Sequence, residues 1–193
     1  MAHLLPVNCT PSYIKNKWFN EERRTMKIRS EQPSDYQGIA ETIAQAFEQD
    51  NEVRLVQEIR KSDRYIPNLS LVAEVNDVII GHILFSYIDL VNDVTYKVLG
   101  LAPLAVRSQF QKQGIGSALV REGLTRANVM EESIAIVLGH PQFYPRFGFE
   151  PSVGYGIESP FPVPEDYFMV KPLNSYQDTQ RGKVIYPPAF AGV

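Results

Sequence analysis

Cysteine is almost absent from this sequence, since Cys9 is the only one among 193 residues. A single cysteine forms no disulfide within the chain and no thiolate metal site, and an irregular N-terminal stretch is a poor place for a nucleophile. Histidine is also scarce, and His3, His82 and His140 show none of the spacings typical of metal ligands. We therefore expect no metal site.

Long apolar runs and an excess of charge of one sign are missing too. No stretch approaches the roughly 18 to 20 consecutive apolar residues that span a bilayer, and the N-terminus has no signal-peptide core. The 19 basic and 22 acidic residues give a formal net charge of -3, without the basic cluster that nucleic-acid binding requires. We expect a cytoplasmic protein that binds neither membrane nor nucleic acid.

Hydrophobic periodicity predicts one α/β domain in residues 26–172, between an N-terminal extension (1–25) and a C-terminal strap (173–193). A short strand and two helices are expected first, followed by a hairpin, a buried strand, a helix, another buried strand, a short helical turn and a last strand. In residue numbers, the hairpin is 69–75 and 78–88, the buried strand 98–106, the long helix 114–130, the next strand 133–139, the turn 142–147 and the last strand 167–171. A strand, helix, strand order implies a right-handed crossover between parallel neighbours.

One proline interrupts the first buried strand. Pro103 lies inside the apolar run 98–106 and has no N–H to donate to a neighbouring strand. The sequence therefore predicts a bulge, or a local parting of the sheet, at this position.

Two glycines follow that strand at the entry to the long helix. Gly114 and Gly116 allow backbone N–H groups to approach a ligand closely, and the helix dipole favours negative charge there. Arg107 and Lys112 add positive charge, so the loop suits a diphosphate; relief of crowding at a helix start is the alternative explanation. No Walker loop is present, and Leu119 occupies the third glycine position of a dinucleotide fingerprint.

The run QKQGIG, with Gln111, Gly114 and Gly116, resembles motif A of the GNAT superfamily of N-acetyltransferases, written (Q/R)xxGx(G/A). The similarity continues in FYPRFGF and covers residues 26–172 in the family's order of elements. AFEQDNE, LAPLAV and YPPAF are most similar to a bacterial subgroup of predicted small N-acetyltransferases. The resemblance implies a GNAT-like domain with a central mixed, mostly antiparallel sheet, flanked by helices and containing a splayed parallel strand pair.

The resemblance also implies the chemistry, which is direct transfer of an acetyl group from acetyl-CoA to a primary amine of a small molecule or peptide. In the family, the pantetheine arm lies between the splayed strands, and free N–H groups at the bulge align the thioester and stabilise an oxyanion. The implied cofactor-binding residues are Leu104, Ala105 and Val106 at the bulge and Gln111, Lys112, Gln113, Gly114, Ile115, Gly116 and Ser117 at the loop.

Tyr144 matches the position where the family often has a tyrosine near the sulfur, which makes it the candidate acid for the departing thiolate. Simple packing among the neighbouring phenylalanines is the alternative. Glu52 is a candidate contact for the acceptor amine. No base is assigned, because residues 97–99 read Lys-Val-Leu where many relatives have a glutamate. His82, on an apolar strand face, is expected to be a hydrogen-bonded core histidine.

Three functions remain open at this point. The first is an amine N-acetyltransferase, the second is an acyltransferase that uses a longer acyl-CoA or a peptide N-terminus, and the third is a non-catalytic module that senses acyl-CoA. A homodimer, formed through an edge strand or the C-terminal strap, remains open as well.

Overall fold

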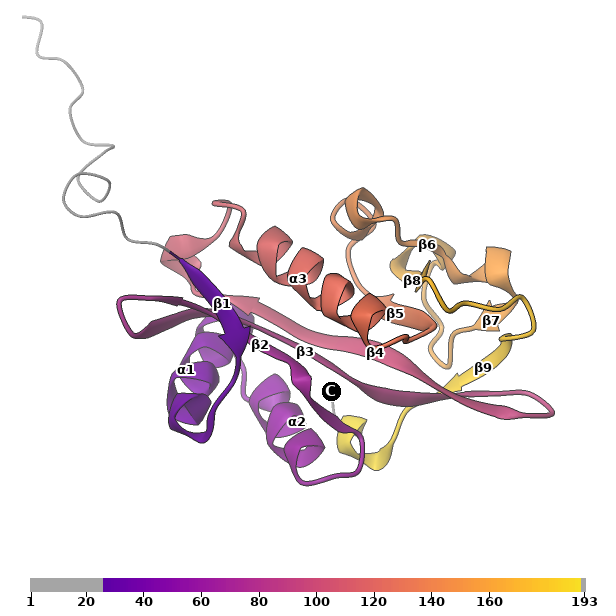
Figure 1. Cartoon of the computed structure of the whole chain (residues 1–193), viewed down its shortest axis with the longest axis horizontal. Coiled ribbons are helices and arrows are strands. Elements are labelled where there is room, and N and C mark those ends of the chain that lie inside the picture. Colours follow the sequence, from indigo (N-terminus) through magenta and orange to yellow (C-terminus); the bar gives the residue numbers. More distant parts are fainter. Residues whose placement is uncertain (1–25, 192–193) are drawn as a thin grey trace, which may run out of the picture.

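The computed structural model describes residues 26–191, so the expected extension (1–25), with Cys9 and His3, lies outside the described residues. Within residues 26–191 nine strands form one sheet, in the order β1-β2-β3-β4-β5-β8-β6, with β9 beside β3 and β7 beside β9 (Figure 1). The strands are β1 (Lys27–Ser30), β2 (Tyr65–Val75), β3 (Val78–Val91), β4 (Thr95–Val106), β5 (Ile134–Leu138), β6 (Glu150–Pro151), β7 (Ile157–Glu158), β8 (Phe168–Pro172) and β9 (Gly182–Ile185). Neighbours are antiparallel except for β4–β5 and the short β7–β9 pair. The mixed, mostly antiparallel sheet expected from the sequence is confirmed.

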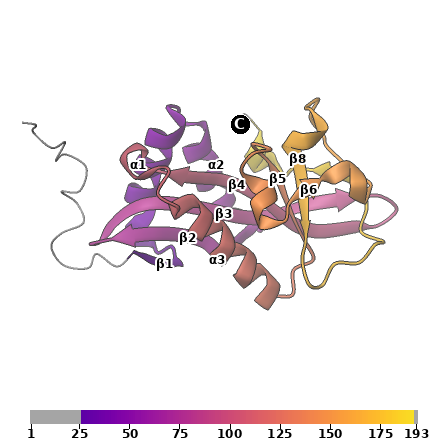
Figure 2. The ribbon, with the colours of Figure 1, turned by 90° about the horizontal axis from the view of Figure 1, so that it is seen from above.

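Helices cover both faces of the sheet (Figures 1 and 2). α1 (Tyr36–Phe47) and α2 (Asn51–Arg60) lie on one face, and α3 (Ile115–Val129) lies on the other. Each helix turns an apolar stripe inward, because its buried side chains recur every three or four residues. Among the described residues, no helix is both long enough and apolar enough to cross a membrane.

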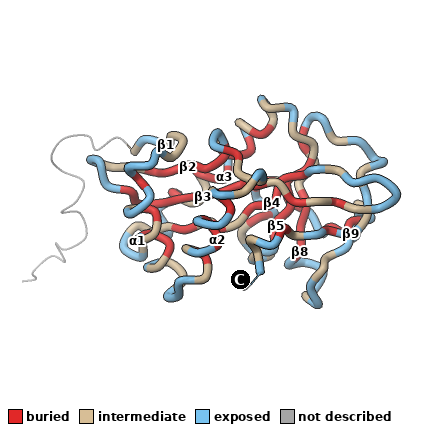
Figure 3. The backbone as a smooth tube through the Cα atoms, turned by 90° about the horizontal axis from the view of Figure 1, so that it is seen from below, coloured by how far each residue is buried: buried red, intermediate tan, exposed pale blue. Residues whose placement is uncertain are grey.

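The core fills the space between these layers, and buried positions are concentrated along the central strands (Figure 3). On the α3 face, Leu119, Val120 and Leu124 pack with side chains of β2 and β3 such as Phe85. On the opposite face, the stripes of α1 and α2 pack with a second set that includes Ala105 of β4. The central strands are therefore buried on both sides.

Two strands begin earlier than the sequence indicated. β2 starts at Tyr65, and a register shift between Tyr65 and Ser70 accommodates Pro67, which reads as a strand breaker in the sequence. β4 starts at Thr95 because it pairs with β3 along a long hairpin arm from Val91. Cross-strand pairing, which a local pattern does not reveal, extends both elements.

The C-terminal segment, which we expected to run along the surface as a strap, is partly built into the sheet. Its strand β9 pairs with β3 at Asp89–Ile185 and Leu90–Val184, and the side chain of Val184 is fully buried. The following residues, Tyr186 to Ala191, pass beneath the sheet to α2.

Candidate functional site

The parallel strands β4 and β5 part soon after they meet. They pair only at Leu99–Ala135 and Gly100–Ile136, although β4 continues to Val106 and β5 to Leu138. At the same place β4 carries an extra residue relative to β3, since Ile83 faces Leu104 while Phe85 faces Leu101. Pro103 lies inside this bulge, so the parting predicted from the proline is confirmed.

The bulge directs backbone donors into the gap. The N–H of Arg107 donates to the carbonyl of Ile80 at 3.0 Å. Because donors alternate along an antiparallel strand, the N–H of Ala105 also points to β3, whereas those of Leu104 and Val106 point to the side where β5 has turned away. Of the three bulge residues implied by the resemblance, Leu104 and Val106 therefore present donors to the gap.

The first turn of α3 opens beside this gap with three backbone donors that lack a helical partner. The first bond within the helix runs from the N–H of Ala118 to the carbonyl of Gly114 at 2.9 Å, which leaves the N–H groups of Ile115, Gly116 and Ser117 without one. No side chain caps this end of the helix. Three aligned donors at the positive end of a helix dipole form a binding place for a phosphate group.

The glycines of this turn do not relieve crowding between protein atoms. A Cβ atom at Gly114 would meet nothing within 4 Å, and one at Gly116 would reach only ordinary contacts of 3.7 to 3.8 Å with Phe143, Val106 and Leu104. Gly114 is required by its φ of +87°. Gly116 has no such requirement, so the open space beside it, between the helix and the bulge, fits a ligand that approaches the backbone.

The side chains of two loop glutamines hydrogen-bond to the backbone of the same segment. The amide of Gln111 donates to the carbonyl of Val106 at 3.1 Å, and the amide of Gln113 donates to the carbonyl of Gln109 at 3.0 Å. Both glutamines therefore shape the loop, while Lys112 is exposed in the left-handed region with a φ of 59°. Ile115 is buried in the core, so only its backbone faces a ligand.

Arg107, which we expected to add charge to the loop, is turned toward α1 instead. Its Nε donates to the hydroxyl of Thr42 at 3.1 Å, and its Nη2 lies 3.3 Å from the carboxylate of Glu41. This ion pair offsets the charge of the guanidinium, and Lys112 is the cation of the loop itself.

Tyr144 lies in a short 3-10 turn (Tyr144–Phe147) after β5 and is 8% exposed. Its ring packs on Gly139 and makes edge contacts with Phe143 and Phe149, at 5.0 and 5.6 Å between centroids. Burial raises the pKa of Tyr144 to about 12, so the hydroxyl is protonated at neutral pH. Phe143, which faces Gly116, links this tyrosine to the head of α3.

Glu52 lies on the buried stripe of α2, with Leu55, Val56 and Ile59, and is 7% exposed. Its carboxylate accepts hydrogen bonds from the amide of Gln49 at 2.9 and 3.2 Å, and no cation of residues 26–191 lies within ion-pair distance. A buried carboxylate without a cation is unusual for a purely structural residue. The same end of α2 packs, through the partly buried Val53, on the face of the sheet opposite α3.

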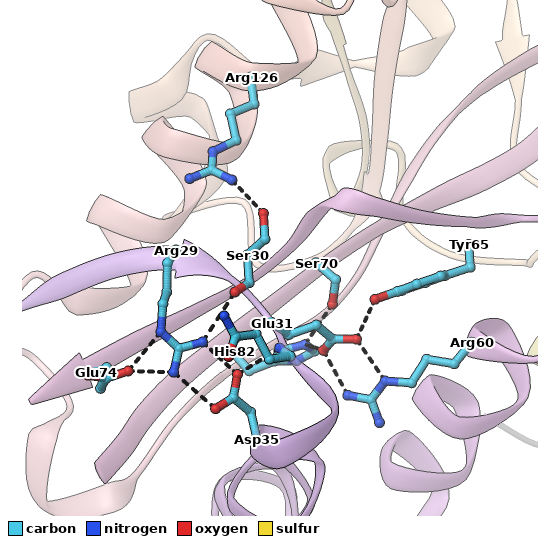
Figure 4. A network of polar contacts seen from close by, with 11 residues as sticks. Arg29, Ser30, Glu31, Asp35, Arg60, Tyr65, Ser70, Glu74, His82 and Arg126 are labelled. Carbon is cyan, nitrogen blue, oxygen red and sulfur yellow. Dashed lines mark hydrogen bonds and ion pairs between the residues drawn. The ribbon is translucent and has the colours of Figure 1, made fainter. Parts of the chain in front are cut away.

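A polar network that the sequence did not reveal holds α2 against the sheet (Figure 4). Glu31 accepts two hydrogen bonds from Arg60, at 2.8 and 2.7 Å, and one from the hydroxyl of Tyr65 at 2.6 Å. His82, which is completely buried, contacts both Glu31 and Ser70 at 3.2 Å, so the expectation of a hydrogen-bonded core histidine is confirmed. The partners are ordinary residue types far apart in the chain, and no spacing signals them.

Charge and burial decide the protonation states in this network. The hydrogen bonds from Arg60, His82 and Tyr65 outweigh burial and hold the pKa of Glu31 far below its usual value. Burial lowers the pKa of His82, against the opposing effect of Glu31. At neutral pH the network therefore contains an ionised glutamate and a neutral histidine.

Comparison with known proteins identifies relatives among the N-acetyltransferases. A family model described as "Acetyltransferase (GNAT) domain" matches residues 27–152. The chain is 34% identical over 156 residues to the uncharacterized N-acetyltransferase YjhQ of Escherichia coli, which covers 78% of this chain and 86% of that protein. It is 36% identical over 149 residues to the uncharacterized N-acetyltransferase YhbS of the same species, and this match covers 77% of this chain and 87% of that protein.

Solved structures of similar proteins contain the coenzyme. The structure of YhbS from E. coli in complex with CoA superposes with a TM-score of 0.78 at 31% identity, covering 88% of this chain and 94% of that one. A GNAT acetyltransferase from Brucella melitensis in complex with acetyl-CoA gives a TM-score of 0.72 at 29% identity, covering 87% and 99%.

Proposed function

The chain belongs to the GNAT family of N-acetyltransferases, and from this premise we propose that it transfers an acetyl group from acetyl-CoA directly to a primary amine of a small molecule or peptide. The observation that carries the proposal is the head of α3, where three unpartnered N–H groups open beside the gap between β4 and β5. A diphosphate at the helix and a thioester in the gap match this arrangement.

Acetyl-CoA, the acetyl donor, would be bound almost entirely by backbone groups. The N–H groups of Ile115, Gly116 and Ser117 would bind the diphosphate, with the exposed Lys112 as the nearby cation. The N–H groups of Leu104 and Val106 would contact the thioester carbonyl, because no strand competes for them on that side of β4. Two donors fixed before the reaction starts stabilise a developing oxyanion without reorganisation.

Transfer requires one bond to form and one to break at the carbonyl carbon. The ammonium form of the acceptor first loses a proton to solvent, and the neutral amine nitrogen then adds to this carbon. The C–S bond breaks, the coenzyme leaves as a thiolate, and the second amine proton passes to solvent or to the thiolate. No covalent intermediate with the enzyme is needed.

Tyr144 would assist the leaving group chiefly as a hydrogen-bond donor. The pKa of the Tyr144 hydroxyl is about 12, whereas the pKa of an ordinary thiol is about 8.5. Full proton transfer from the tyrosine to the thiolate is therefore uphill. A hydrogen bond to the thiolate carries no such penalty. Glu52 would attract the ammonium form of the acceptor, because its buried carboxylate lacks a cation among the described residues.

Calorimetry with acetyl-CoA and with free CoA tests the donor site. A free-thiol release assay against polyamines, amino acids, aminoglycosides and peptide N-termini then tests transfer. Binding followed by thiol release with one of these classes supports the proposal. Absence of binding refutes the donor site, and binding without release from any class refutes transfer and leaves a module that senses acyl-CoA.

A further inference from the structure

The C-terminal strap ends beneath the sheet, on the face opposite α3. After β9 the chain forms a short turn, Pro188–Phe190, that contacts α2. Phe190 is the one ring of the described residues that packs against both apolar clusters of this face. One of these clusters contains Ala105 of β4, and the other contains Val98 of β4 and Ile136 of β5. Phe190 therefore lies beneath the sheet where these two clusters meet, on the face opposite α3.

The strap is joined to the sheet by strand pairing at one end and by side-chain contacts at the other. β9 anchors it to β3 through backbone pairing and through the buried side chain of Val184. Beyond Tyr186 its backbone bonds are local, from Phe190 to Pro187 and from Ala191 to Pro188, both at 2.9 Å. Two hollows of about 370 and 410 Å³ lie between this turn and α2. Side chains, rather than a strand ladder, hold this part of the strap in place.

The side chains on the inner side of the strap are aromatic. The rings of Tyr186 and Phe190 are 4.8 Å apart, and Phe161 lies 5.5 Å from Tyr186. The strap approaches α2 beside Leu55, on the helix that also carries the buried carboxylate of Glu52. An acceptor on this face would therefore meet a carboxylate for its ammonium group and aromatic rings for the rest of the molecule.

We propose that the segment from Tyr186 to Phe190 is a lid on the acceptor side of the gap, with Phe190 as the residue that selects amines carried on an aromatic or apolar group. The inference rests on the proposed function. When the lid is closed, Phe190 shields the thioester from water; when an acceptor is present, the ring packs on its apolar part.

Acetyl-CoA alone provides a test that needs no knowledge of the natural acceptor. Without the lid, water replaces the amine: its oxygen adds to the carbonyl carbon, the C–S bond breaks, and acetate and free CoA are released. We expect Phe190→Ala to raise this thiol release at least about fivefold while the Kd for CoA is unchanged. Ile185→Ala, which truncates an exposed side chain of β9 just before the lid, is the matched control and should leave the rate as it is.

Two amines test the selection. We expect the wild-type chain to release thiol faster with phenethylamine than with ethanolamine, by about tenfold or more, because packing of an aromatic ring against Phe190 favours the first amine. Phe190→Ala should reduce this ratio, and Phe190→Leu, which keeps an apolar side chain, should retain most of it. Thiol release by Phe190→Ala equal to that of wild type overturns the lid, and equal or absent turnover of the two amines by wild type overturns the selection. Loss of CoA binding by wild type would instead refute the proposed function.

Discussion

Replacing Gly116 by alanine separates the needs of the ligand from those of the fold. The residue lies in the first turn of α3, and a Cβ atom there would make only ordinary contacts, the nearest at 3.7 Å. Alanine is favoured over glycine in helices by up to about 1 kcal/mol, so the free energy of unfolding should stay the same or rise. For a chain of this size, Tm should be unchanged or higher by up to about 2 to 4 °C.

The affinity for CoA should move in the opposite direction. The new methyl group would occupy the space toward Phe143, Val106 and Leu104, through which a ligand must approach the helix. Losing one hydrogen bond to a charged phosphate costs about 1.5 to 3 kcal/mol, which raises Kd roughly 10- to 150-fold.

Calorimetry and thermal unfolding of the same samples check this prediction. Gly154→Ala is the matched control, because a Cβ atom there meets nothing within 4 Å and the residue lies in another loop. The same substitution at Gly114 would be less informative, because the positive φ of that residue would add backbone strain. Wild-type CoA affinity in Gly116→Ala would refute a diphosphate site at the head of α3.

Three further predictions concern the tyrosine and the buried network. Tyr144→Phe should lower kcat at saturating substrates by about tenfold or more, because a hydrogen bond to the charged thiolate contributes about 1.5 to 3 kcal/mol. The Kd for CoA should change little, and an unchanged kcat would remove the hydroxyl from catalysis. Glu31→Gln leaves the guanidinium of Arg60 without its partner, so the free energy of unfolding measured in urea should fall by about 3 to 5 kcal/mol. The control Glu58→Gln removes an exposed pair with Lys61 and should change this free energy by less than about 1 kcal/mol. Burial lowers the pKa of His82 from 6.5, so as the pH falls the unfolded chain takes up this proton before the folded chain does. The free energy of unfolding should therefore decrease as the pH drops below 6.5, by at most about 1.4 kcal/mol per pH unit. Urea unfolding at a series of pH values measures this slope, and a slope that His82→Gln does not flatten would contradict the assignment.

Local patterns were sufficient for much of the fold. The stripe of α3 and the apolar run of β5 appear directly in the sequence, and both elements formed within one residue of their expected ends. Pro103 predicted the bulge because a missing donor acts at its own position. The early starts of β2 and β4 were missed, since each depends on pairing with β3.

In the candidate site, too, local sequence revealed some features and packing decided others. Gly114 and Gly116 identified the loop, because glycine at a helix entry reports a backbone requirement. The orientation of Arg107 toward Glu41, and of Gln111 toward the carbonyl of Val106, depends on neighbours that the loop sequence does not contain. Residue type indicated which side chains were available, and packing determined where they point.

The sequence by itself determined the family, the order of the elements, the parting of the sheet at Pro103 and the position of the glycine-bearing loop before α3, because each depends on residues close together in the chain. Only the tertiary structure decided that Glu31, Arg60 and His82 meet in the core and that Phe190 packs against both apolar clusters on the face opposite α3. These contacts join residues 29 to 51 positions apart in the network, and the last turn of the chain to its central strands. Such long-range pairings form only when the whole sheet closes around them.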